Sequence, residues 1–188
     1  MENSQISKDA AVVSNFKSTS MKWGLIGGLV VILYSIIMYV IDSSLMVNMW
    51  AGFVGLAVLL VVLVMGVKEV RTGQEGYISL SEALFTAFFI YVIATLLSTL
   101  FNYLLFNWID PNLPVLLKEK TIETTVEMMQ KFGASEEDIN KALSQLDGKL
   151  DVASPSIMFW NFIKGSAFGF VIAFIIALIM KKKRAIFE

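Results

Sequence analysis

The chain has 188 residues, of which 56% are hydrophobic and only 16% are charged, and its mean hydropathy is +0.70. A chain this apolar cannot cover its hydrophobic surface by folding in water, which excludes an ordinary soluble domain. The absence of cysteine and histidine excludes disulfides, thiolate or histidine catalysis and the usual zinc, haem and iron–sulfur ligands, and a net charge of −1 excludes the basic surface that nucleic acids require.

The first predicted elements are a polar segment, residues 1–22, and two hydrophobic spans. Residues 23–41 are a stretch of 19 without a charge, and residues 47–67 are a stretch of 21. About 20 apolar residues in an α-helix cross a hydrocarbon core of about 30 Å, so each stretch predicts a transmembrane helix. The first span is longer than a signal-peptide core and no small-residue cleavage pattern follows it, so we expect an uncleaved anchor.

Residues 80–108 predict the third span, with Glu82 as its one charged residue. Ser79 and Glu82 have the spacing of a capping box, in which the serine hydroxyl and the glutamate carboxylate satisfy free backbone amides at a helix start. A proton-relay role is the alternative for Glu82, because a carboxylate in a span is often functional. Asp110 followed by proline predicts the end of this helix.

The 48 residues 109–156 form a long loop whose pattern is helical. Apolar residues from Ile122 to Phe132 follow helical spacing and stop at Gly133, a natural helix end. Ser135 then predicts the cap of a second helix, whose apolar stripe begins at Ile139. Two such helices should pack together or lie on the bilayer surface. They either bind a partner or cover the outer ends of their own bundle.

Residues 157–180 predict the fourth span, with Lys164 as its one charged residue, after a helix start at Ser154-Pro155. We therefore expect an all-α membrane protein, a four-transmembrane-helix bundle with a helical extracytoplasmic loop. A tryptophan lies near an end of each span, where an indole prefers the headgroup layer. These tryptophans are Trp23, Trp50, Trp108 and Trp160.

Basic residues predict the orientation of the bundle in the membrane. One side of the predicted bundle carries nine of them, whereas residues 42–46 on the other side carry none and the loop 109–156 has five lysines against nine acids. The positive-inside rule places the basic side, with the N-terminal segment 1–22 and the tail 181–188, in the cytoplasm. The nine are Lys8, Lys17, Lys22, Lys68, Arg71, Lys181, Lys182, Lys183 and Arg184.

Polar side chains in the third span form the first part of a candidate site. Tyr91, Thr95, Ser98 and Asn102 recur at intervals that place them on one helix face, with Thr99 beside them. We call these five residues the polar stripe. It predicts either a functional polar surface inside the membrane or ordinary interhelical hydrogen bonding, at about 0.6 kcal/mol for each bond.

Lys164 is the second part of the candidate site, because an ammonium inside a span is unfavourable and often functional. If Trp108 and Trp160 share a depth in antiparallel helices, Asn102 and Lys164 come within about one turn of each other. Asp42, at the outer end of the first span, could neutralise the lysine. The hypothesis is a buried cluster of these three residues; the alternative is that Lys164 extends to the outer interface, one turn away at Trp160.

Small residues recur at every fourth position in all four spans, which lets helix backbones approach closely. They serve either the chain's own bundle or a contact with a second copy or another membrane protein. These residues are Gly24 and Gly28, Ala51 and Gly55, Ala83 and Ala87, and Gly165, Gly169, Ala173 and Ala177.

Three stretches and their order resemble a known family. They are GVKEVRTGQEGYISLSEALFTAF at residues 66–88, FNYLLFNWIDP at 101–111 and KFGASEEDINKALSQL at 131–146, followed by a final span that ends in KKK. The chain resembles the small Bacteroidetes membrane proteins catalogued as domain of unknown function 4199, from about Trp23 onward. The resemblance implies a four-span inner-membrane protein of a Gram-negative bacterium, and it implies no activity.

For function, the sequence favours a non-enzymatic membrane component that assembles with or regulates a partner, because no acid–base pair, metal ligand cluster or cofactor motif is present. We expect no catalytic, cofactor-binding or metal-binding residue. Its partners would be the bilayer and a second copy or another membrane protein, through the small residues or the outer loop. The alternative is a small transporter or channel subunit that uses the polar stripe and Lys164.

Overall fold

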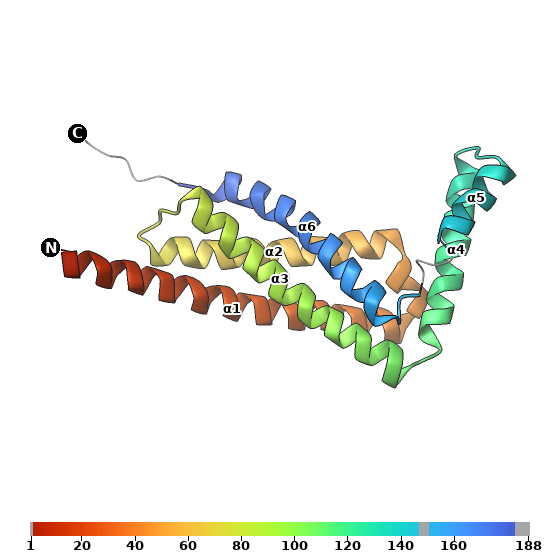
Figure 1. Cartoon of the computed structure of the whole chain (residues 1–188), viewed down its shortest axis with the longest axis horizontal. Coiled ribbons are helices and arrows are strands. Elements are labelled where there is room, and N and C mark those ends of the chain that lie inside the picture. Colours follow the sequence, from red (N-terminus) through yellow and green to blue (C-terminus); the bar gives the residue numbers. More distant parts are fainter. Residues whose placement is uncertain (1, 147–150, 183–188) are drawn as a thin grey trace.

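The computed structural model describes residues 2–146 and 151–182, with side chains for 16–145 and 151–182. The described chain is helical, and four of its helices are long and apolar enough to cross a membrane (Figure 1). The expected all-α membrane bundle is confirmed. Its elements are α1 Glu2–Ile41, η1 Ser43–Val47, α2 Met49–Gly73, α3 Leu80–Leu104, η2 Leu105–Ile109, α4 Leu113–Lys131, α5 Glu136–Leu146 and α6 Pro155–Met180.

Helix α1 begins well before the first predicted span. It runs from Glu2 to Ile41 without a break, so residues 2–22 of the polar segment are a helical extension of the span and not a separate tail. No glycine or proline precedes Gly24, and nothing else in this stretch prevents the helix from continuing. The N-terminal turns reach beyond the other helices of the bundle (Figure 1).

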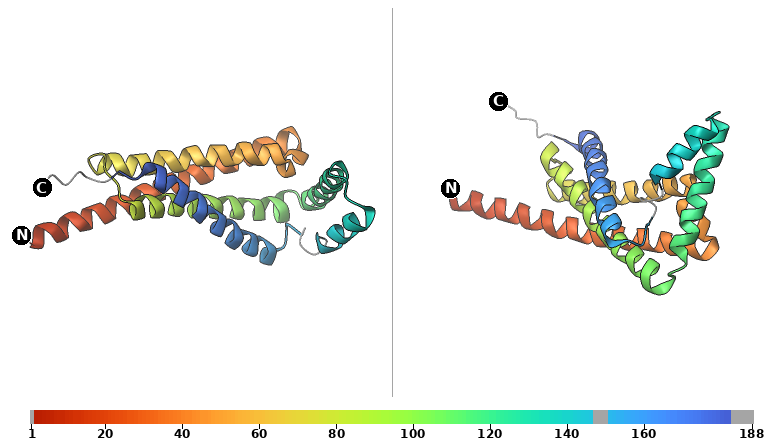
Figure 2. Two further views of the ribbon diagram at one scale, coloured as in Figure 1. Left: turned by 90° about the horizontal axis from the view of Figure 1, so that it is seen from above. Right: turned by 45° about the vertical axis from the view of Figure 1, so that its right-hand side comes forward.

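Helix α3 is the centre of the bundle, because it packs against α1, α2 and α6. The fully buried side chains Leu63, Val67 and Ile90 form the middle of the core. Helix α6 packs mainly along α3 and touches α2 less, and it crosses α3 at an angle in both views of Figure 2. The half of α6 near Pro155 therefore diverges from α2.

The small residues make contacts within the bundle. A Cβ atom at Gly24 would lie 2.7 Å from that of Ile93, and a Cβ at Gly28 would meet Leu97 in the same way. Ala83 is fully buried, as are Ala87, Ala173 and Ala177. Close approach of the chain's own helices accounts for these positions, which favours the first of the two interpretations of the small-residue pattern.

The start of α1, the end of α6 and the α2–α3 linker lie at one end of the bundle, which we call the terminal end (Figure 1). Here the backbones of Ile78 and Lys182 form an antiparallel bridge with two N–H···O bonds of 3.0 and 2.9 Å. Glu69 also joins two helices, because it accepts bonds from the Lys22 ammonium at 3.0 Å and from the Trp23 indole at 2.8 Å. Lys183, Arg184 and the side chain of Lys8 lie outside the described residues.

The opposite end, which we call the hairpin end, carries η1, η2 and the antiparallel pair α4–α5. The third span ends at Asp110 as predicted, but its last turn is a π-helix in which the Asp110 amide donates to the Leu105 carbonyl at 2.8 Å. Such a turn inserts one residue into the helix and has no clear sequence signal.

The two loop helices are confirmed, although the first is longer than its apolar pattern. Helix α4 already begins at Leu113, because the Asp110 carboxylate accepts the backbone amides of Asn112 and Leu113. It ends before Gly133, which has a φ of +76°, and the Ser135 hydroxyl accepts the Asp138 amide at 3.2 Å to cap α5. The loop residues 147–150 lie outside the description.

Candidate functional site

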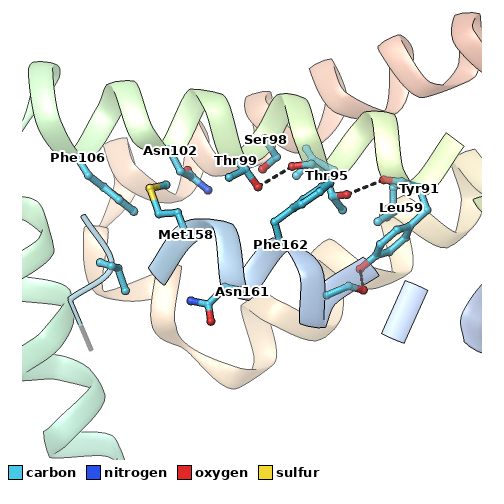
Figure 3. Close-up of a pocket in the computed structure, with 13 residues that line it drawn as sticks. Leu59, Tyr91, Thr95, Ser98, Thr99, Asn102, Phe106, Met158, Asn161 and Phe162 are labelled. Atoms are coloured by element: carbon cyan, nitrogen blue, oxygen red, sulfur yellow. Dashed lines mark hydrogen bonds between the residues drawn. The ribbon is translucent and has the colours of Figure 1, made fainter. Parts of the chain in front are cut away.

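A groove of about 350 Å³ opens between α3 and α6 in the half of the bundle next to the hairpin end (Figure 3). The polar stripe of α3 forms one side, and Met158, Asn161, Phe162 and Gly165 of α6 form the other. Val31 of α1 and Leu59 of α2 line its base. The crossing angle of α6 creates this space, because the two helices separate toward Pro155. All five residues of the polar stripe therefore face one surface, as their spacing predicts.

The start of α3 is fixed by the predicted capping box. The Glu82 amide donates to the Ser79 hydroxyl at 3.2 Å, and the Ser79 amide donates to the Glu82 carboxylate at 2.9 Å. The Gln74 side chain donates to the same carboxylate at 3.3 Å. These bonds support the capping role of Glu82 and fix the start of α3 at the terminal end.

The threonine hydroxyls of the polar stripe bond within their own helix. Thr95 donates to the Tyr91 carbonyl at 2.8 Å, and Thr99 donates to the Thr95 carbonyl at 2.8 Å. These bonds to the preceding turn are a common arrangement for threonine in membrane helices. The expected interhelical bonds are therefore absent at these two residues of the described chain.

Tyr91 closes the groove in the middle of the bundle. Its hydroxyl donates to the Gly165 carbonyl of α6 at 2.9 Å, and its ring occupies the space where a Cβ of Gly169 would lie. The side chain is 7% exposed. From Tyr91 to the terminal end the space between the helices is filled by core residues that include Ile90 and Ala173. The groove is therefore blind at this depth.

Ser98 and Asn102 are the members of the polar stripe with unused hydrogen-bonding capacity. The Asn102 carboxamide extends from α3 toward Met158 of α6 (Figure 3). Its Oδ1 atom is buried without a hydrogen bond, and neither side chain has a partner among the described residues. The buried Asn102 oxygen is an acceptor, so a ligand that offers a hydrogen-bond donor would satisfy it.

The structure separates Asp42 and Lys164 from the rest of the predicted cluster. Both are exposed, neither lines the groove, and no ion pair joins them in the described part of the chain. Lys164 lies about 100° around α6 from Gly165, which turns it from the groove toward the surrounding lipid. Asp42 instead caps η1 by accepting the Ser44 amide at 2.9 Å, and its hydrogen bonds to Ser44 hold the pKa of its carboxyl below the usual value.

The α4–α5 hairpin is a second candidate site. Only its base packs on the bundle, where Leu113 and Leu117 meet Leu105 and Phe106. Beyond this base it runs across the bundle axis and extends past the bundle (Figure 1). Helix α5 packs chiefly against α4, with Ile139 buried between them. The two helices therefore form a projecting unit.

A family model described as a protein of unknown function, DUF4199, matches residues 22–182. The chain belongs to this family. The match includes the four spans, the groove and the hairpin, so the family resemblance inferred from the sequence is confirmed. No curated protein and no solved structure matches the chain.

Two polar features of this DUF4199 chain were not predicted from the sequence. Asn161 lies at the edge of the groove, and its position four residues before Gly165 on one helix face is a signal that could identify it. The second is a bond of 3.1 Å from the Tyr39 hydroxyl to the Asp110 carboxylate, which joins α1 to the end of η2. No local pattern predicts a contact between residues so far apart in the chain.

Proposed function

We propose that this DUF4199 protein is a non-enzymatic component of a bacterial inner membrane that binds a neighbouring membrane protein through its hairpin. The observation that carries the proposal is the projection of α4–α5 beyond its own bundle (Figure 1). A loop that only covered the bundle would bury its helices against the ends of the spans. This hairpin instead buries Ile139 within itself and extends past the side of the bundle (Figure 1).

The tip of the hairpin has the composition of a protein interface. Phe132 is 85% exposed, and the charged first turn of α5, residues 136–138, begins four residues later. An aromatic side chain surrounded by polar and charged residues is typical of binding hot spots. A partner that covers Phe132 would shield from water one of the most exposed aromatic rings outside the membrane spans.

The proposed orientation has both termini in the cytoplasm. Six described basic residues support it, because they lie in the parts of α1 and α2 at the terminal end or directly after the end of α6. They are Lys17, Lys22, Lys68, Arg71, Lys181 and Lys182. The hairpin would then be extracytoplasmic, where it could meet the outer domain of a partner.

A transporter or channel role has less support. A transport path would have to continue past Tyr91 through the part of the core that contains Leu63 and Ile90. Both of these side chains are fully buried. A groove that is closed at this depth suits binding better than conduction. The non-enzymatic assignment rests on the sequence, which lacks the residue types of most catalytic constellations.

Site-specific photo-crosslinking in cells tests the hairpin proposal. A photoreactive phenylalanine analogue at Phe132 or at the exposed Asn140 should give one reproducible crosslinked protein, identified by mass spectrometry. The matched control is Leu33, which is exposed on α1 at the level of the lipid and should crosslink to lipid alone. The same product at all three positions, or none at the two hairpin positions, would contradict the proposal.

A further inference from the structure

Lys164 lies near the centre of the bilayer. It is about 5 Å from the middle of α6, on the side of the hairpin end. Its neighbour Gly165 accepts the bond from the Tyr91 hydroxyl, and Tyr91 is about 5 Å from the middle of the third span, Leu80–Ile109, on the side of the terminal end. The two helices are joined at one depth and are displaced in opposite directions, so this depth is close to the bilayer centre.

The ammonium of Lys164 has no partner at this depth. Its side chain is exposed on the surface of the bundle, and no carboxylate of the described chain pairs with it. Half of a hydrocarbon core is about 15 Å, so a stem of four methylenes does not bring the ammonium from the centre to the headgroup layer. A charged side chain inside a membrane normally pairs or faces the bundle interior. An unpaired ammonium on the lipid-facing surface therefore indicates that another molecule covers it.

Lys164 belongs to one exposed stripe of α6, which we call the α6 seam. The seam consists of Asn161, Lys164, Phe168, Val171 and Ile175. These residues follow each other at intervals of three and four, so they lie along one helix face in the pattern by which two helices pack at a small crossing angle. The last three are each more than half exposed. The seam therefore has the register of a helix–helix contact and is free in the described chain.

The polar residues of the seam define the chemical group that complements it. Asn161 and Lys164 are one turn apart, and the other exposed side chains of α6 between Trp160 and Met180 are apolar. The carboxamide and the ammonium both offer N–H donors, and neither bonds to a described residue. A carboxylate has two acceptor oxygens and a negative charge, so one carboxylate complements both side chains.

A second copy of the chain does not supply this carboxylate. The four described spans contain two glutamates and no aspartate. Glu69 is paired with Lys22 and Glu82 completes the capping box, and both lie at the terminal end. In a copy inserted in the same orientation these groups are again at the terminal end, away from the depth of Lys164. A carboxylate at that depth has to come from a different protein.

We propose that the α6 seam binds a transmembrane helix of another membrane protein, one that carries an aspartate or a glutamate in the middle of its span. The carboxylate pairs with Lys164 and accepts a further bond from Asn161, and apolar side chains of the partner pack on the rest of the seam. Pairing removes an isolated charge of each helix from the lipid. The seam is a different surface from the hairpin, and the contact holds whether or not the hairpin binds the same protein.

Synthetic transmembrane helices test the chemistry of the seam. The probe is a leucine–alanine helix with one aspartate at its centre, and the two matched helices carry asparagine or leucine there. Energy transfer between the labelled helix and the labelled full chain in phospholipid bilayers measures binding. We expect the aspartate helix to bind about tenfold more tightly than the leucine helix, with the asparagine helix between the two.

Variants of the chain assign this preference to Lys164. Lys164→Met should reduce binding of the aspartate helix to the level of the leucine helix, whereas Lys164→Arg should retain it. The thermal midpoint should change little in either variant, because the side chain is exposed. Equal binding of the aspartate and leucine helices, equal binding of the aspartate and asparagine helices, or an unchanged preference in Lys164→Met would overturn the proposal.

Photo-crosslinking in cells tests the natural partner. A photoreactive phenylalanine analogue at Val171, in the seam, should give one protein with a carboxylate in its span, and replacement of that carboxylate by its amide should abolish the product. Phe170, also exposed on α6 but outside the seam, is the matched control and should give lipid alone. At Val171, a product without a carboxylate in its span, a dimer of this chain, or lipid alone would overturn the proposal.

The crosslinks also separate the seam from the hairpin. A product at Phe132 with lipid alone at Val171 would overturn the seam contact and leave the hairpin proposal intact. A product at Val171 without one at either hairpin position would contradict the hairpin proposal alone.

Discussion

Tyr91 divides the membrane bundle into a packed part and an open part. Its ring lies against Gly169 and its hydroxyl reaches the Gly165 carbonyl, so it makes two contacts with α6 one turn apart. On one side of these contacts the core is filled, and on the other the groove opens. Glycine at position 169 is required because a larger residue would overlap the aromatic ring.

Gly169→Ala should therefore destabilise the bundle by about 1 to 3 kcal/mol, the usual effect of overpacking a core. Gly52→Ala is the matched control, because Gly52 is also in a membrane helix and a Cβ there meets no heavy atom within 4 Å. That substitution should leave stability unchanged or raise it by up to about 1 kcal/mol. Unfolding in mixed micelles with increasing dodecyl sulfate measures both, and equal effects would contradict this packing.

At the scale of the element, the start of α3 depends on reciprocal bonds between Ser79 and Glu82. Ser79→Ala should destabilise the protein by about 1 kcal/mol, because one amide at the helix start loses its acceptor. Glu82→Gln should leave stability nearly unchanged, since glutamine also completes a capping box. Glu82→Ala should lower stability, because alanine cannot accept the bond from the Ser79 amide. Thermal unfolding in detergent measures these changes. A functional defect in Glu82→Gln without a loss of stability would instead favour the proton-relay role.

The elements themselves were largely predictable from the sequence. Long apolar stretches with at most one charge identified the spans, and Ser79, Gly133 and Ser135 identified helix boundaries, because these signals are local. The polar stripe was also predictable, since helical spacing alone places its members on one face. The π-helical turn at η2 was not, because it depends on how the chain packs at the hairpin end.

The sequence could not predict how Asn102 and Lys164 lie relative to each other. Depth along a helix can be counted, but the rotation of one helix against another depends on packing. The contact of Tyr91 with Gly165 fixes the face of α6 that meets α3, and Lys164 then points away from it. Asp42 is likewise held by its bonds to Ser44 at the end of α1.

At the scale of the whole molecule, the hairpin resembles an insertion between two parts of one cluster. Leu117, before the hairpin extends, and Val152, after it returns, pack in the same apolar cluster at the hairpin end. A short linker can therefore join them. Replacement of residues 118–150 by a glycine–serine linker should leave the thermal midpoint of the bundle within a few degrees, because no core residue of the spans is removed.

The same replacement should abolish recovery of the partner protein when the shortened chain is purified from native membranes. Circular dichroism in detergent measures the stability of the bundle, and mass spectrometry of the purified material measures partner recovery separately. Unfolding of the shortened chain would show that the hairpin stabilises the bundle, which contradicts its role as a projecting unit.

The backbone bridge between Ile78 and Lys182 has a mechanical consequence for the whole protein. It fastens one end of a rod about 39 Å long, the 26 residues of α6, while the other end is free of α2. A rotation of 5° about the fastened end would displace the free end by about 3 Å, roughly the width of an atom. Lateral pressure in one leaflet would thus change the width of the groove, with the opposite leaflet as the fixed support.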